Sequence, residues 1–274
     1  MSVSPARTGF LLMAASSLLF SLMSAAVRMA SEVPAHTLSF IRFAFGAAVV
    51  LTLVAAGRAN LRTGNPRFLF WRGLLGGLAV YLFYLAICKV GLAKGTVLSY
   101  TYPIFVPVFG ALVLRERVRL NVGIGILVAF VGVYLIVSPE NMLQVTRYDA
   151  AGLLSGVFSA SAIVCIKRLR ETDSPFVIFL SQCVFGMLLV GVPAVRSGFD
   201  FPARLLPVLA GVALFAVTAQ LLMTYSYKLV SATSGSLMGY LTPVFNVALG
   251  VAAFNEKLGH TGVVGCVLVL AVSL

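Results

Sequence analysis

The amino-acid sequence predicts an all-α membrane protein in which ten transmembrane helices form two inverted five-helix repeats around a central cavity. About 60% of the 274 residues are hydrophobic and only 10% are charged, whereas a soluble domain carries roughly 25% charged residues. The apolar residues gather into runs of about 20, the length at which a helix spans a bilayer core. The chain also resembles itself when it is shifted so that Gly95 falls on Gly235, and this shift is called the repeat offset.

Composition excludes several classes of protein. The net charge is +12, but the basic residues stand singly or in short groups between apolar runs, as loop charges of a polytopic membrane protein do. This excludes a soluble enzyme, a disordered protein and a nucleic-acid-binding domain. The four cysteines lie inside apolar runs without metal-ligand spacing, so we expect no metal and no cofactor. The expected partners are the lipid bilayer and a small-molecule solute, with a monomer as the expected state.

Each run of membrane-spanning length is taken as one helix. In chain order the runs are Phe10–Met29, Ala35–Ala56, Phe68–Cys88, Leu92–Leu114, Val122–Ser138, Ala150–Ile166, Pro175–Val195, Leu205–Tyr227, Ala232–Phe254 and Thr261–Leu274. The first run resembles a cleavable signal peptide, but it has a counterpart later in the chain and is expected to be a helix of the mature protein. Leu274 corresponds to Tyr134 at the repeat offset, so we expect a short last helix.

Basic residues between the runs predict the orientation. On the side of the N-terminus we count 12: Arg7, Arg58, Arg62, Arg67, Arg72, Arg115, Arg117, Arg119, Lys167, Arg168, Arg170 and Lys228. The other side holds 7: Arg28, Lys89, Lys94, Arg147, Arg196, Arg204 and Lys257. The positive-inside rule therefore predicts a multi-pass protein of the cell inner membrane with both termini in the cytoplasm.

The internal repeat sets the domain organisation. Besides Gly95 and Gly235, the repeat offset superimposes Tyr100 on Tyr240, Pro103 on Pro243 and Glu116 on Glu256. We expect a first repeat at 1–138, a linker at 139–149 and a second repeat at 150–274. Because each repeat holds five spans, the second enters the membrane from the opposite face, as in many secondary transporters with a midplane site between their repeats.

Two matching motifs carry a family resemblance. One comprises Pro103 and Glu116-Arg117 and the other Pro243 and Glu256-Lys257, while Arg42-Phe43 in the second run fits the same pattern. In these features the whole chain resembles the drug/metabolite transporter superfamily, and within it the ten-span EamA-type bacterial exporters of amino acids and related metabolites, including the aromatic amino-acid exporters. The resemblance is specific for the family and poor for the substrate.

The prolines and glutamates of these motifs suggest helix shaping and gating. Pro103 and Pro243 are expected inside helices, where a proline removes a backbone hydrogen bond and permits a bend. Glu116 and Glu256 end the same helices. They are interpreted either as interfacial anchors or as gate residues that form salt bridges across the repeat interface.

Arg42 is the one charge well inside a run. A buried cation is a functional candidate by default, although the arginine can also snorkel to the headgroups.

Polar and aromatic side chains at helical spacing predict the cavity wall. We expect spans 1, 3, 4, 6, 8 and 9 to contribute Ser21, Tyr81, Tyr84, Tyr100, Tyr102, Ser159, Thr224 and Tyr240 to a substrate-binding site. Aromatic walls with a few hydroxyls suit a small, partly apolar solute with a polar end. Serines in membrane helices also serve close packing alone.

These features predict a secondary transporter, not an enzyme, that exports small neutral or zwitterionic metabolites, such as aromatic or apolar amino acids, by alternating access. Because all eight acidic residues fall near span ends or in loops, transport without a coupling ion is expected. An exchanger of phosphorylated metabolites or nucleotide sugars remains an alternative, which would require several basic residues in the cavity. A membrane-embedded lipid enzyme is a further alternative, but His36 and His260 stand alone, without the cluster that such chemistry requires.

Overall fold

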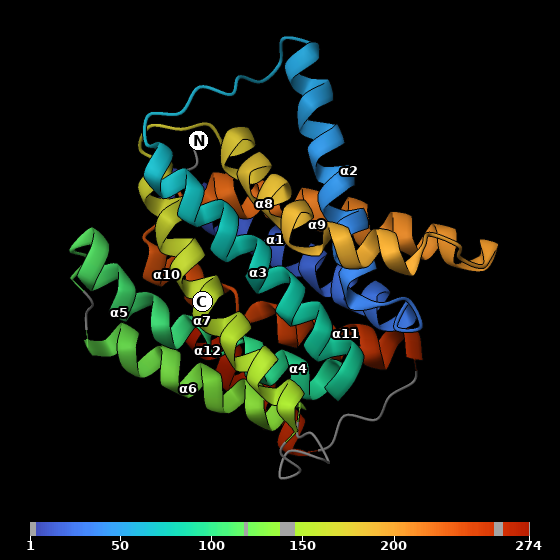
Figure 1. The fold of residues 1–274 in the computed structure, drawn as a ribbon. Helices are drawn as coiled ribbons and strands as arrows, with labels where there is room; N and C mark the ends of the chain where they lie inside the picture. The colour runs from blue at the N-terminus through green and yellow to red at the C-terminus, as the bar shows by residue number, and fades with distance from the viewer. Residues whose placement is uncertain (1–3, 118–119, 138–145, 255–259, 274) are drawn as a thin grey trace.

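The chain folds into one bundle of helices (Figure 1). The computed structural model describes residues 4–117, 120–137, 146–254 and 260–273. Within these ranges the helices are α1 (Pro5–Met29), α2 (Ala35–Ala55), α3 (Pro66–Val90), α4 (Leu92–Ser99), α5 (Tyr102–Leu114), α6 (Leu120–Val137), α7 (Arg147–Leu169), α8 (Pro175–Ser197), a 3₁₀ turn η1 (Ala203–Leu205), α9 (Leu206–Ser226), α10 (Ala232–Met238), α11 (Leu241–Phe254) and α12 (His260–Ser273).

Helices lie at all ten predicted apolar runs, and in the described chain seven segments are long and apolar enough to cross a membrane. These are α1, α2, α3, the α4–α5 segment, α7, α8 and the η1–α9 segment, while α6 and α12 are shorter apolar helices. Large side chains such as Leu112, Leu120 and Leu188 are more than 70% exposed on the outside of the bundle, as expected for a surface that faces lipid. The chain is therefore a multi-pass membrane protein, and the count of ten spans stays a prediction.

Local sequence explains where several helices begin. In each case a polar cap precedes a proline at the start of the helix, and the cap side chain accepts a hydrogen bond from a backbone N–H in the first turn: Ser4-Pro5 for α1, Asn65-Pro66 for α3 and Ser174-Pro175 for α8. Proline suits this position because its missing N–H would have no partner in the helix. These three helices therefore begin at, or a few residues before, the start of an apolar run.

The fourth and ninth predicted spans are each broken into two helices. The chain leaves the helix after Ser99 and re-enters it at Tyr102, and it leaves after Met238 and re-enters at Leu241. Pro103 and Pro243 therefore lie in the first turns of α5 and α11, and the prediction that they lie inside continuous helices is wrong. The cause is local, because each proline removes the N–H that would bond four residues back, and its ring crowds that carbonyl.

Contacts between the two halves of the chain occur in reciprocal pairs. α1 packs on α9 and α3 on α7; α5 packs on α7 and α11 on α1; α2 packs on α9 and α8 on α3. In each pair the second contact is the first with the halves exchanged. In addition, α2 packs on α8 and α6 on α12, which are counterparts at the same place in each half.

Small residues permit the closest of these contacts. At the crossing of α3 and α8, a Cβ atom added to Gly77 would lie 2.9 Å from the Cα atom of Gly186. The backbones can approach this closely only because both positions are glycine, as is common where membrane helices pack. This contact holds α3 against α8 beside a central cavity.

Candidate functional site

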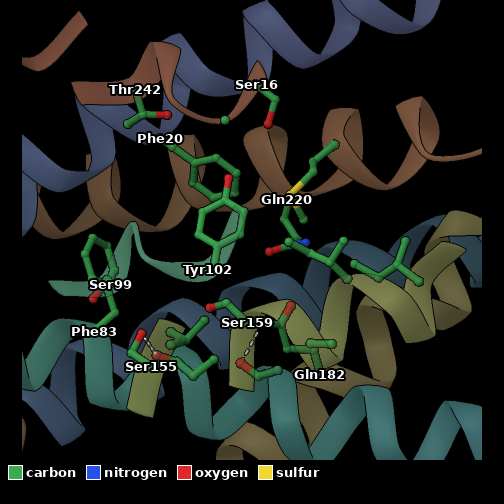
Figure 2. A pocket seen from close by; sticks show the side chains of 18 of the residues that line it. Ser16, Phe20, Phe83, Ser99, Tyr102, Ser155, Ser159, Gln182, Gln220 and Thr242 are labelled. Atoms are coloured by element: carbon green, nitrogen blue, oxygen red, sulfur yellow. Dashed lines mark hydrogen bonds between the residues drawn. The ribbon is translucent and has the colours of Figure 1, made fainter. Parts of the chain in front are cut away.

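A cavity of about 130 Å³ lies in the middle of the bundle. Its wall contains Ser16, Phe20 and Met23 of α1, Arg42 of α2, Arg72, Gly76 and Phe83 of α3, Tyr102 of α5, Ser155 and Ser159 of α7, Gln182 of α8 and Gln220 of α9. Figure 2 shows Tyr102 in the centre, with Gln220 and Ser159 on one side and Phe83 and Ser99 on the other. Both halves of the chain therefore contribute to the wall.

Arg42 lies in this wall and is 2% exposed. Its Nη1 atom donates to the Tyr84 hydroxyl at 3.3 Å and to the Met23 sulfur at 3.5 Å, and its Nη2 atom donates to Gln220 Oε1 at 3.4 Å. The two bonds to oxygen are long, and all three acceptors are uncharged. The buried Nε atom of Arg42 has no hydrogen-bond partner. The alternative that Arg42 snorkels to the headgroups does not fit its burial.

Arg72 is a second buried cation in the same wall, and it is only 1% exposed. Its Nη2 atom donates to Gln182 Oε1 at 2.8 Å, but its Nε and Nη1 atoms are buried without a partner. The prediction that Arg72 lies in a cytoplasmic loop is wrong, because the residue lies inside α3. The signal was available, since Arg72 lies four residues inside the third apolar run and one to three turns from Gly76, Val80 and Phe83, which line the same cavity.

The two arginines follow a crossed pattern between the halves. Arg42 of α2 contacts Gln220 of α9, and Gln182 of α8 contacts Arg72 of α3. These are reciprocal helix pairs, and Gln182 is the residue that the repeat offset aligns with Arg42. Gln182 is also anchored, because its Nε2 atom donates to the Gly76 carbonyl at 2.9 Å. The first half thus presents two guanidinium groups, and the second half presents the two amides that accept from them.

Aromatic rings and hydroxyls form the remainder of the wall. The rings of Tyr100 and Tyr102 lie 5.6 Å apart between centroids, at the break between α4 and α5. Ser155 is already satisfied, since its hydroxyl donates to the Ala79 carbonyl at 3.0 Å. No Asp or Glu lies among the wall residues that the structure describes. The site therefore combines two cations with an apolar, aromatic surface.

Three of the eight predicted substrate-binding residues line the cavity: Tyr100, Tyr102 and Ser159. The hydroxyl of Ser21 donates instead to Asn246 Oδ1 at 2.7 Å, and that of Thr224 to the Gln220 carbonyl of its own helix. Tyr84 lies behind the wall as a partner of Arg42. Tyr81 packs between hydrophobic clusters. Tyr240 is fully buried.

The predicted gate residue Glu116 reaches across to the other half of the chain. Its carboxylate accepts hydrogen bonds from the Ala232 backbone N–H at 3.1 Å and from the Thr233 hydroxyl at 3.2 Å. It thus caps the first turn of α10, and of the two interpretations the salt bridge across the repeat interface is not among its contacts with described residues. Glu256, its counterpart, lies outside the described residues.

A second polar contact joins the halves at the start of α4. Lys94 Nζ lies 2.9 Å from Asp149 Oδ2 at the start of α7, and both side chains are at most 10% exposed. Both residues are predicted near span ends, but their pairing is not predicted. Within the part of the chain that the structure describes, no group of three His, Cys, Asp or Glu side chains could hold a metal ion.

A bundle of apolar helices around a polar cavity, with contacts that join its two halves, is the architecture of a membrane transporter. The chain belongs to the EamA-like transporter family, whose family model matches residues 7–138 and again residues 146–274. It is 32% identical over 269 residues to the pseudopaline exporter CntI of Pseudomonas aeruginosa, covering 96% of this chain and 94% of that protein. It is 26% identical to solute carrier family 35 member G1 of Homo sapiens, covering 93% of this chain and 75% of that one.

A solved crystal structure supports the fold independently. It superimposes on this chain with a TM-score of 0.78 at 20% sequence identity, covering 99% of this chain and 95% of that one. At this identity the match concerns the fold alone. The evidence for the cavity and its two arginines therefore comes from the structure of this chain.

Proposed function

We propose that this protein exports small metabolites across the inner membrane by alternating access through the cavity between its two halves. The observation that carries the proposal is the composition of the wall, to which helices of both halves contribute. When one half rocks against the other, such a site is exposed first to one side of the membrane and then to the other. Two relatives are named as an exporter and as a solute carrier, which supports a transport function.

The reciprocal helix contacts support an inverted repeat. The self-similarity at the repeat offset and the contacts that recur with the halves exchanged are what a two-fold axis in the membrane plane would produce. We therefore retain ten spans with both termini in the cytoplasm. A reporter enzyme fused to the C-terminus should be active only in the cytoplasm, and activity restricted to the periplasm would contradict this topology.

Two of the polar contacts between the halves, those of Lys94 and Glu116, supply closures for such a cycle. Lys94 and Glu116 lie near opposite ends of the α4–α5 segment, and each contacts the second half of the chain. If that segment crosses the membrane, the two contacts lie toward opposite faces. Opening the cavity to either face would then require one of them to break.

The solute proposed from the wall is a small amino-acid-like metabolite. The rings of Phe20, Phe83 and Tyr102 offer an apolar surface, while Ser159 and Gln220 offer hydrogen bonds. Because no carboxylate lies among the described wall residues, a cationic drug is a poor substrate and a proton carrier is not provided.

A second candidate, an exchanger of phosphorylated metabolites, gains support from one observation. Such a protein needs several basic residues in its cavity, and Arg72 adds a second to Arg42. Arginine pairs well with phosphate as well as with carboxylate. A direct comparison of carboxylate and phosphate ligands is therefore needed to decide which anion the cavity binds.

Transport is tested directly in proteoliposomes. The purified protein, reconstituted in vesicles loaded with labelled amino acids, should release one or more of them faster than protein-free vesicles. Labelled sugar phosphates in the same assay test the second candidate. Release at the protein-free rate for every amino acid, with rapid exchange of a sugar phosphate, would replace the first candidate by the second.

A further inference from the structure

Arg42 and Arg72 are buried cations without an anionic partner among the described residues. Their hydrogen bonds go to amide, hydroxyl and thioether groups, and three of their nitrogen atoms have no partner: Nε of Arg42, and Nε and Nη1 of Arg72. A buried charge is costly unless it is paired and hydrogen-bonded. Two such charges in the wall of one cavity therefore call for an anion.

The ion pairs in the described chain do not supply that anion. The acidic residues with described ion pairs or hydrogen bonds engage other groups, such as Asp149 with Lys94 and Glu116 with α10. The described cavity wall itself contains no Asp or Glu. A solute can supply the negative charge that the described residues do not provide.

Deepening the function proposed above, on which this step rests, we infer that the cavity binds an organic anion whose carboxylate groups are held by Arg42 and Arg72. A guanidinium presents a planar fork of N–H donors that matches a carboxylate, which lysine cannot do. Because one arginine comes from each of two helices, α2 and α3, a solute with two carboxylates can engage both. This excludes neutral solutes without a carboxylate and extends the proposed substrate class from zwitterionic amino acids to organic acids.

The rest of the wall defines the other end of the solute. Phe20, Phe83 and Tyr102 surround the same space (Figure 2) and provide an apolar surface. A cavity of about 130 Å³ limits the solute to a small molecule. An aryl or alkyl group attached to one or two carboxylates fits both requirements.

A series of related ligands, titrated into the purified protein, tests whether the cavity binds a carboxylate. The probes are phenylsuccinate, 3-phenylpropionate, phenylalanine, phenylalaninamide and phenyl phosphate, each titrated while thermal unfolding in detergent is followed. We expect phenylsuccinate to stabilise most, and phenylalanine to bind about tenfold or more tightly than phenylalaninamide, because hydrogen bonds to charged groups are lost with the amide. Equal stabilisation by the amide, stabilisation by phenyl phosphate only, or no stabilisation by any carboxylate would overturn the inference.

Variants separate ligand binding from a structural role. Arg72→Gln and Arg42→Gln should lose about tenfold or more of the affinity for phenylsuccinate, and Arg72→Lys should keep the preference for carboxylate over amide. Since each change to glutamine removes a poorly paired charge, the ligand-free midpoint should stay equal or rise. Arg204→Gln is the matched control, because Arg204 is an exposed arginine paired with Glu32. Unchanged affinity in both cavity variants, or a midpoint lowered by several degrees in both, would assign the arginines a structural role.

Flux of the same probes distinguishes this inference from the proposed function. A probe that binds by its carboxylate but is not moved across proteoliposomes contradicts transport and leaves the binding site in place. Probes that are transported equally well with and without a carboxylate contradict the anion site and leave transport in place.

Discussion

The Arg72 guanidinium lies directly over the backbone of Gly76, one turn further along α3. A Cβ atom added to Gly76 would lie 1.6 Å from Arg72 Nη1 and 3.3 Å from Gln182 Nε2. The absence of a side chain at Gly76 thus creates the space that the cation occupies, while the Gly76 carbonyl holds the glutamine that accepts from it. Sequence alone gives no reason for this glycine beyond close packing.

Gly76→Ala should therefore displace Arg72 without unfolding the protein. The clashing atom is the far end of a flexible side chain, and alanine favours the helix over glycine by about 1 kcal/mol. We expect a thermal midpoint within a few degrees of the parent and a loss of phenylsuccinate binding like that of Arg72→Gln. Gly123→Ala, where an added Cβ would meet nothing within 4 Å, is the control. Parental affinity in Gly76→Ala would mean that the position of Arg72 does not matter for binding.

The ion pair between Lys94 and Asp149 should contribute measurably to stability. Both side chains are nearly buried and lie 2.9 Å apart between Nζ and Oδ2. In a double-mutant cycle of Lys94→Met and Asp149→Asn, we expect a coupling of about 1 kcal/mol in the free energy of unfolding. Unfolding in detergent measures it. Strictly additive effects would show that the two charges do not stabilise one another.

Glu116 should stabilise the start of α10. Glu116→Ala removes the acceptor for the Ala232 N–H and the Thr233 hydroxyl, and the loss of such a cap costs about 1 kcal/mol. If this contact closes one face of the cavity, its loss also changes the flux rate, whereas Thr233→Val should have a smaller effect in the same direction. Arg117→Ala, an exposed neighbour, is the control. An unchanged thermal midpoint in Glu116→Ala would contradict the capping role.

Transport should not require a proton gradient. The described cavity wall holds no Asp or Glu that could carry a proton through the cycle. In proteoliposomes the flux should persist when a protonophore collapses the pH gradient, at the rate set by the solute gradient alone. Strict dependence of the flux on the pH gradient would contradict this expectation.

The positions of the helices were more predictable than the faces they present. Runs of about 20 apolar residues place the helices well, because hydrocarbon permits few other structures. The breaks after Ser99 and Met238 were not predicted, because proline in a membrane segment is compatible with a kink as well as with a break. The internal repeat correctly paired these two positions even though the kind of distortion was wrong.

The cavity wall was only partly predictable, for a physical reason. In a helix that is apolar all round, periodicity does not tell which face lies inward. Polarity, helical spacing and the repeat therefore predict tyrosines in the wall, although Tyr240 packs beside Tyr100 without lining the cavity and Tyr84 lies behind Arg42. Arg72 was missed because a charge near the start of a span is normally a loop residue, and only tertiary packing shows that it is covered.

The most direct test of the central claim, that the cavity between the halves is the transport route, is the flux through Ser159→Trp. Ser159 lies in the wall, and an indole ring there would fill much of a cavity of about 130 Å³. Leu154→Trp, on the exposed side of the same helix, is the matched control. In proteoliposomes we predict solute efflux at the protein-free rate for Ser159→Trp and at the parental rate for Leu154→Trp, with similar thermal midpoints. Parental efflux through a folded Ser159→Trp variant would show that solute does not pass through this cavity.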